Sequence, residues 1–147
     1  MNGLGGDNFW LVSEGGKPPV GIDACGASAG LATRGFYAEN GHKGAIPSRG
    51  PLAALTAAGA VSGWQKALEI SASWGGRLPL SRLLADARHY ARHGFPVTRT
   101  QANNTISKRA ELEPVAGFAS IFMPGGSAPG VGDHFKTVKL ADTLDHL

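Results

Sequence analysis

Two histidines of this chain have a spacing that could bind a metal ion. His89 and His93 are four residues apart in a segment with helical periodicity, and this spacing can bring two imidazoles to one ion. No Glu-Xaa-Xaa pattern lies between them, and no third ligand stands out in the sequence. On a helical wheel they lie opposite an apolar stripe, which favours a solvated helix face over a metal site.

Cys25 is the second residue that could perform chemistry. It follows an expected strand and precedes Gly26, so a sharp turn could present its thiol as a nucleophile. None of the five histidines forms a recognisable catalytic arrangement with it, and packing among small residues is the favoured interpretation. Cys25 is the single cysteine of the chain and cannot form an internal disulfide. The cysteine count therefore does not indicate whether the protein resides in an oxidising or a reducing compartment.

A glycine-rich segment, Gly3-Leu4-Gly5-Gly6-Asp7, could bind an anion through its backbone amides. It precedes a strand, whereas dinucleotide-binding glycines follow a strand and open a helix, so we interpret it as a tight structural turn. The sequence contains no Gly-Xaa-Ser-Xaa-Gly elbow and no clear pair of catalytic carboxylates. The residues by themselves therefore predict no catalytic, substrate-binding or metal site, and no cofactor.

The elements that surround these residues indicate an α+β fold. The apolar run 8–13 predicts a buried strand, and Val20–Ala24 is expected to return antiparallel to it through a turn at 14–17. A short helix near Ala32–Glu39 is expected, and the pattern of Val61, Trp64 and Leu68 predicts another.

The strongest helical pattern in the chain begins at Leu80 and is expected to close at Gly94 in a left-handed conformation. Further helices are expected from Pro96 or Val97 to Leu112, from Pro114 to Phe122, and over Leu140–Leu144, with a loop over 124–132. Many apolar residues are alanines, so the core should be rich in small side chains.

The charge distribution excludes one class of partner. The net charge is +3, but the 14 Lys and Arg residues are dispersed without a run, so we expect no nucleic-acid binding. No segment approaches the roughly 20 apolar residues of a membrane span, and no signal peptide is recognisable. We expect a soluble chain, periplasmic or cytoplasmic. The last helix and the first strand both lack an evident packing partner, so the chain is expected to be cut from a longer protein.

Several landmarks, read in order, resemble the γ-glutamyltransferase family. Gly3–Val12 is similar to its glycine-rich turn and first strand, and Gly50-Pro51-Leu52-Ala53 with Gly59–Trp64 is similar to the next block, where Ala58 replaces a usual proline. Gly76–Leu80 and Gly94–Val97 resemble the following helix and its exit. The resemblance is clear over Gly3–Val97 and faint beyond.

This resemblance implies part of an N-terminal-nucleophile hydrolase, in which two stacked sheets lie between helical layers in an αββα sandwich. Residues 1–147 would be one partial domain from the large-subunit region. In the family, a precursor cleaves itself, and the new N-terminal Thr of the small subunit cleaves or transfers γ-glutamyl amides. No threonine here matches that position. The implied partners are the rest of the large subunit, the small subunit and a small amide substrate.

The family's large subunit contributes an arginine that binds the donor's α-carboxylate, just after the second strand. In this chain Ala27 or Cys25 takes its place, and nearby Arg34 belongs to no matching motif. The resemblance thus leaves three functions open: a γ-glutamyltransferase or glutathione hydrolase fragment, a cephalosporin-acylase-like relative with another amide substrate, and a non-catalytic structural or interaction module.

Overall fold

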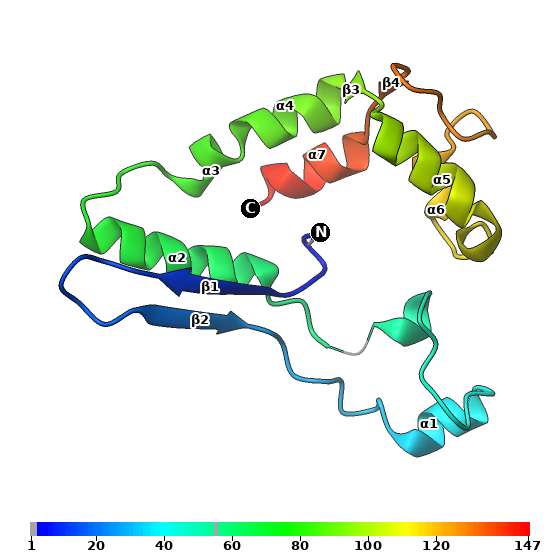
Figure 1. The fold of residues 1–147 in the computed structure, drawn as a ribbon, viewed down its shortest axis with the longest axis horizontal. Helices are drawn as coiled ribbons and strands as arrows, with labels where there is room; N and C mark the ends of the chain where they lie inside the picture. Colours follow the sequence, from blue (N-terminus) through cyan, green and yellow to red (C-terminus); the bar gives the residue numbers. More distant parts are fainter. Residues whose placement is uncertain (1–2, 55) are drawn as a thin grey trace. The chain divides into compact units, whose positions relative to one another are not determined.

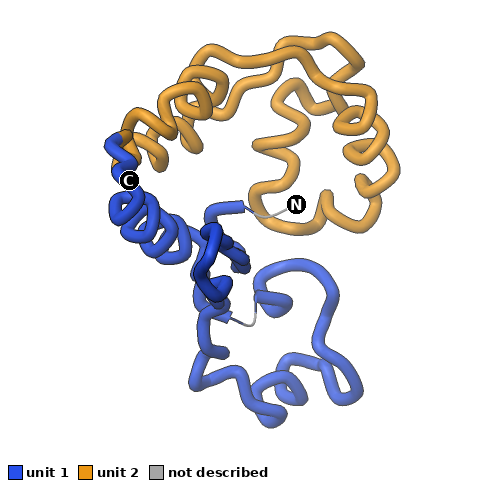
Figure 2. The backbone as a smooth tube through the Cα atoms, turned by 60° about the vertical axis from the view of Figure 1, so that its left-hand side comes forward, with its two compact units in different colours: residues 1–77 blue, residues 78–147 orange. Residues whose placement is uncertain are grey.

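The computed structural model describes residues 3–54 and 56–147 and contains both helices and short strands (Figure 1). The chain forms two compact units, residues 1–77 and 78–147, which are coloured separately in Figure 2. The α+β class predicted from the sequence is confirmed. No helix in the described part of the chain combines the length and apolarity needed to cross a membrane.

The first unit is built on a β-hairpin. Strands β1 (Asn8–Val12) and β2 (Val20–Ala24) pair antiparallel, with Asn8 opposite Ala24 and Val12 opposite Val20. In the connecting turn the Lys17 amide donates to the Glu14 carbonyl at 3.1 Å. Both predicted strands and their hairpin are confirmed, because the apolar runs and the glycine-containing turn agree on one register. The expectation that the first strand is buried was wrong, because its central residues Phe9, Trp10 and Leu11 are exposed.

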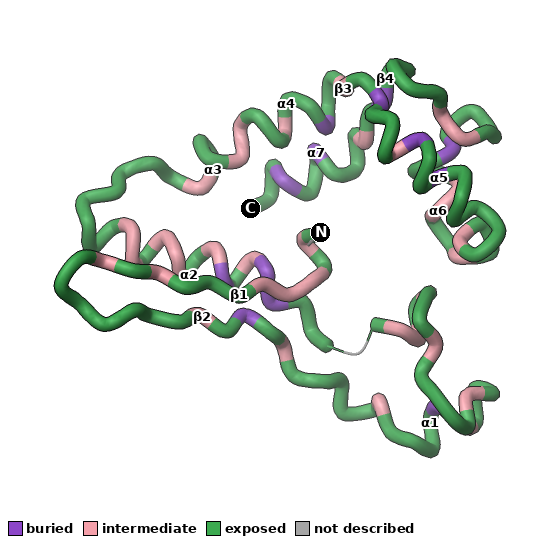
Figure 3. The backbone as a smooth tube through the Cα atoms, in the orientation of Figure 1, coloured by how far each residue is buried: buried purple, intermediate pink, exposed green. Residues whose placement is uncertain are grey.

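Helix α2 (Ala60–Ser73) covers one face of this hairpin (Figure 1). The contact is close because two small residues, Gly63 and Ala24, meet there and are both buried. The side-chain amide of Asn8 also donates a hydrogen bond to the Ala60 carbonyl at 3.0 Å. The opposite face is open, with Phe9 70% and Leu11 79% exposed. Exposed positions predominate along both strands in Figure 3.

Between the hairpin and α2 the chain forms the short helix α1 (Arg34–Glu39) and the 3-10 turn η1 (Pro51–Ala53). The Thr33 hydroxyl caps α1 by accepting a hydrogen bond from the Phe36 amide. This helix confirms the short helix expected before Glu39.

The second unit begins with α3 (Leu80–Leu83) and α4 (Ala85–His93), which replace the one continuous helix expected there. Leu84 interrupts the helix with φ −86° and ψ −4°. Gly94 ends α4 with a φ of +95°, as predicted for a residue in the left-handed region.

The next helix, α5 (Arg99–Leu112), begins later than expected. The preceding residues are held in a small sheet, in which β3 (Phe95–Pro96) pairs with β4 (His134–Phe135). The Thr98 hydroxyl then caps α5 by accepting from the Gln101 amide. Phe135 of this sheet belongs to a small buried core with Val97 and with Ala102 of α5. No local pattern predicted β4.

Two shorter helices complete this unit. Helix α6 (Phe118–Phe122) begins four residues later than expected because Gly117, with φ +91°, is left-handed and cannot continue a right-handed helix backwards. Helix α7 (Val138–Asp145) buries Ala141 and Leu144 and packs against α4. The expectation that this last apolar face lacked a partner in the chain was therefore wrong.

The packing of α2 on the hairpin generates a stability prediction. A Cβ atom at Gly63 would lie 2.1 Å from Asn8 Oδ1 and 2.6 Å from Ala24 Cβ. We expect Gly63→Ala to lower the free energy of unfolding by about 1 to 3 kcal/mol through overpacking, although alanine favours helices. Thermal denaturation of the complete protein measures this change.

Gly35 in α1 provides the matched control, because a Cβ there meets only Thr33 Oγ1 at 3.8 Å. Gly35→Ala should be neutral or stabilise by up to about 1 kcal/mol. Equal effects of the two substitutions would contradict the close approach of α2 to the hairpin.

Candidate functional site

The site suggested by the sequence lies at the end of β2. Cys25 is the first residue after this strand, and its side chain is exposed. Its backbone amide donates a hydrogen bond to Asp23 Oδ1 at 3.0 Å, which turns the chain away from the strand direction. The structure therefore presents the Cys25 thiol to solvent at the strand's exit.

The Asp7 carboxylate joins this exit to two other segments. Asp7 Oδ1 accepts from the Gly26 amide at 3.3 Å, and Asp7 Oδ2 accepts from Thr56 Oγ1 at 3.0 Å and from Cys25 Sγ at 3.4 Å. These hydrogen bonds, led by that of the Gly26 amide, lower the pKa of Asp7 despite the opposing effect of burial. We call Asp7, Cys25, Gly26 and Thr56 the Asp7 cluster.

Backbone contacts hold the same segments together. The Ala57 amide donates to the Ala27 carbonyl at 3.0 Å, and Ser28 and Thr56 form an isolated antiparallel bridge. A Cβ atom on Gly26 would lie 1.9 Å from the Ala57 carbonyl oxygen, so only glycine allows this approach. The position of Thr56 beside Asp7 depends on this close contact.

The electrostatics of the Asp7 cluster determine what the thiol can do. The hydrogen bond to Asp7, burial and the negative charges of Asp7 and Asp23 all raise the pKa of Cys25. A nucleophilic cysteine needs a lowered pKa, so this environment argues against the nucleophile interpretation. The neutral thiol can instead act as a weak hydrogen-bond donor.

The two other residues considered for the position of the family's arginine, Ala27 and Arg34, are not members of the Asp7 cluster. Ala27 is exposed and uses its carbonyl in the backbone contact with Ala57. Arg34 is an exposed residue at the start of α1. Asp7 and Thr56 were not predicted as site residues, because 49 positions separate them and no local pattern links such distant residues.

The glycine-rich segment before β1 is a structural turn. The Gly6 amide donates to the Gly3 carbonyl at 3.0 Å, and the Gly6 carbonyl accepts from the amides of Gly59 and Ala60 at 3.1 and 2.9 Å. These amides lie at the start of α2, and an anion bound there would have to accept hydrogen bonds from them. The protein's own carbonyl occupies them, which favours the tight-turn interpretation over a phosphate site.

His89 and His93 both lie on the exposed side of α4, as the helical wheel predicted. Their ring centroids are 4.7 Å apart. Over residues 3–54 and 56–147 no group of three or more His, Cys, Asp or Glu side chains has the arrangement of a metal site.

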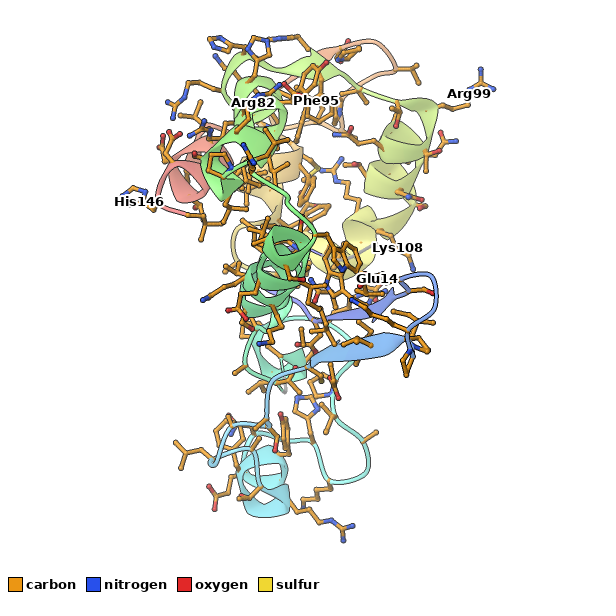
Figure 4. All side chains as sticks on the ribbon, turned by 90° about the vertical axis from the view of Figure 1, so that its left-hand side faces the viewer. Glu14, Arg82, Phe95, Arg99, Lys108 and His146 are labelled. Carbon is orange, nitrogen blue, oxygen red and sulfur yellow. The ribbon has the colours of Figure 1, made fainter. Side chains whose placement is uncertain are left out.

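A hollow of about 220 Å³ lies where the turn end of the hairpin meets α2. Its walls include Val12, Val20, Ile70 and Trp74, and the Trp74 indole donates to Glu14 Oε2 at 2.7 Å. Figure 4 labels Glu14 beside this end of the hairpin. The walls are mainly apolar, so this hollow offers no arrangement for bond-breaking chemistry.

We compared the chain with known protein families and with characterised proteins. The γ-glutamyltranspeptidase family profile matches residues 1–147. An oxamate amidohydrolase proenzyme from Klebsiella pneumoniae is 52% identical over 145 residues, which are 98% of this chain and 27% of that protein. A glutathione hydrolase-like proenzyme, YwrD, from Bacillus subtilis is 38% identical over 146 residues, 99% of this chain and 26% of that protein.

Solved structures agree with the sequence comparison. The crystal structure of a cephalosporin acylase from Bacillus halodurans superposes with a TM-score of 0.80 at 31% identity, over 99% of this chain and 27% of that one. The chain thus spans about a quarter of the length of these relatives. Its strands and helices form part of an N-terminal-nucleophile hydrolase sandwich, and the chain belongs to the γ-glutamyltranspeptidase family.

Proposed function

We propose that the complete protein containing this chain hydrolyses a small carboxamide, with oxamate as the first substrate to test. The family match and the 52% identity to an oxamate amidohydrolase proenzyme support this substrate class. Residues 1–147 act as a partial domain from the large-subunit region and shape the site. The remainder of that subunit packs on the open hairpin face that carries Phe9 and Leu11.

The observation that carries the proposal is the chemistry at the exit of β2. In the family that this chain resembles, an arginine just after the second strand binds the donor's α-carboxylate. The first residue after β2 here is Cys25, whose neutral thiol donates to Asp7. Without the cation, a γ-glutamyl substrate loses a charge-assisted contact of about 2 to 5 kcal/mol.

Oxamate does not need a cation at the exit of β2, because its carboxylate lies closer to the bond that is cleaved. The α-carboxylate of a γ-glutamyl group is separated from the scissile carbonyl by a chain of carbons, whereas the carboxylate of oxamate is bonded directly to its amide carbon. When its amide carbon is at the nucleophile, a γ-glutamyl group can therefore extend its α-carboxylate to the Cys25 turn. The carboxylate of oxamate instead stays close to the nucleophile. The absence of a cation beside Asp7 therefore costs a γ-glutamyl substrate more binding energy than it costs oxamate.

The reaction itself uses residues outside this chain. By family resemblance, self-cleavage frees a threonine at the N-terminus of the small subunit, and its α-amine accepts the hydroxyl proton. The hydroxyl oxygen bonds to the amide carbon, the C–N bond breaks and ammonia leaves with a proton. Water then cleaves the ester, so oxamate and water yield oxalate and ammonium.

A second candidate function is hydrolysis or transfer of γ-glutamyl amides. The family match and the 38% identity to a glutathione hydrolase-like proenzyme favour it. A cephalosporin-acylase-like activity is related to it by the structural comparison. A non-catalytic module would retain the fold and hydrolyse none of these amides.

We expect the purified complete protein to release ammonia from oxamate and to act on γ-glutamyl-p-nitroanilide at least about tenfold less efficiently. Ammonia and p-nitroaniline assays measure the two kcat/KM values. Residues 1–147 expressed alone should hydrolyse neither compound. A higher kcat/KM for the γ-glutamyl compound would support the second candidate, and processed protein without any amidase activity would support the non-catalytic module.

Restoring a cation at the exit of β2 should change specificity. In the complete protein, we expect Cys25→Arg to strengthen inhibition by L-glutamate about tenfold or more, because a guanidinium binds its α-carboxylate. The measurement is the inhibition constant of L-glutamate against oxamate hydrolysis. Ala27→Arg tests the alternative position, and an effect confined to it would assign the place of the arginine to Ala27. No change of the inhibition constant in either variant would contradict the missing-cation argument.

The Asp7 cluster should give the protein a characteristic acid response. The lowered pKa of Asp7 means that its carboxylate stabilises the fold above the unfolded pKa of about 3.9, and this contribution is lost as pH falls through the still lower folded pKa. We therefore expect Asp7→Asn to unfold at a lower temperature than the unchanged protein at neutral pH. Thermal scans should show this gap narrowing below about pH 4, and a gap independent of pH would contradict a charged Asp7.

A further inference from the structure

We propose that His89 and His93 form a binding site for a divalent transition-metal ion on the exposed face of α4. The site shares no residue with the Asp7 cluster and does not depend on the proposed amidase function. It belongs to the second compact unit, and both imidazoles come from one nine-residue helix.

The two rings lie close enough together to share one metal ion once their side chains rotate so that a nitrogen of each faces it. In a metal complex, an ion bound about 2.0 to 2.1 Å from one nitrogen of each ring lies about 3.2 Å from each ring centroid. Two such rings bound at about 90° have centroids about 4.5 Å apart. The observed separation is 4.7 Å, with an angle of 42° between the ring planes.

The ligand type favours some metals over others. Imidazole suits copper, nickel and zinc, and divalent copper binds such ligands most tightly among the first-row ions. We therefore assign Cu²⁺ as the preferred ion, with water completing its coordination at this open surface.

The helix that carries the two imidazoles is held in place before any metal binds. Arg88 pairs with Asp145 at 3.3 Å, and Arg92 pairs with Asp142 at 3.0 Å and with Asp145 at 2.5 Å. Ala91 is buried where α4 packs on α7. Binding thus requires rotation of two side chains rather than formation of a helix, which reduces its entropic cost.

Both imidazoles are available as ligands. Their side chains are exposed, and in the described part of the chain their observed contacts are ring contacts with each other and between His89 and Tyr90. The neighbouring guanidinium groups of Arg88 and Arg92 are paired with carboxylates, so their repulsion of a cation is reduced.

Copper binding to the complete protein tests this site. We expect titration calorimetry with Cu²⁺ to detect a site whose affinity falls about tenfold or more in both His89→Gln and His93→Gln. Electron paramagnetic resonance of the copper-loaded protein should show coupling to two imidazole nitrogens, and to at most one in either variant. Each substitution is at an exposed position, and far-UV circular dichroism checks that α4 remains folded.

The control is His146→Gln, which removes another exposed histidine of the same unit. His146 follows α7, and its Nδ1 lies 2.6 Å from the Asp142 carbonyl oxygen; Figure 4 labels this residue. This variant should bind copper as the unchanged protein does. Unaltered affinity in His89→Gln or His93→Gln, or a comparable loss in His146→Gln, would overturn the proposal.

Discussion

The packing of the first unit depends on acceptors supplied by two adjacent residues, Gly6 and Asp7. The Gly6 carbonyl accepts from the amides of Gly59 and Ala60, and the Asp7 carboxylate accepts from Gly26 and Thr56. The amides at a helix start have no partner within the helix, so they need such acceptors. These few hydrogen bonds therefore set how α2 lies against the hairpin and where the exit of β2 is held.

Small residues make this arrangement possible. At Gly26 and at Gly59 a Cβ atom would lie within 2.0 Å of a carbonyl oxygen of a neighbouring segment, and Gly63 meets Ala24 directly. Backbones can approach this closely only where side chains are absent. The buried core is accordingly rich in alanine, as the composition predicted, and the large side chains Phe9 and Leu11 lie on the open face.

The same acceptors determine the chemistry at the end of β2. A cysteine beside Asp7 and Asp23 has a raised pKa, so its thiol remains a neutral donor where the family resemblance implies a cation. On the proposed function, this difference selects the substrate, and the nucleophile belongs to a part of the protein beyond this chain. On the same proposal, residues 1–147 shape the site and take no part in bond chemistry.

The sequence by itself determined the elements whose signals are local. The hairpin, the end of α5 at Leu112, the left-handed Gly94 and the exposed face of His89 and His93 all follow from turn residues and periodicity. Tertiary structure alone decided three features: the Asp7 cluster, the pairing of β3 with β4, and the burial of α7 against α4. The physical reason is the same for all three, because each joins residues about 40 or more positions apart, and propensity and periodicity carry no information about such contacts.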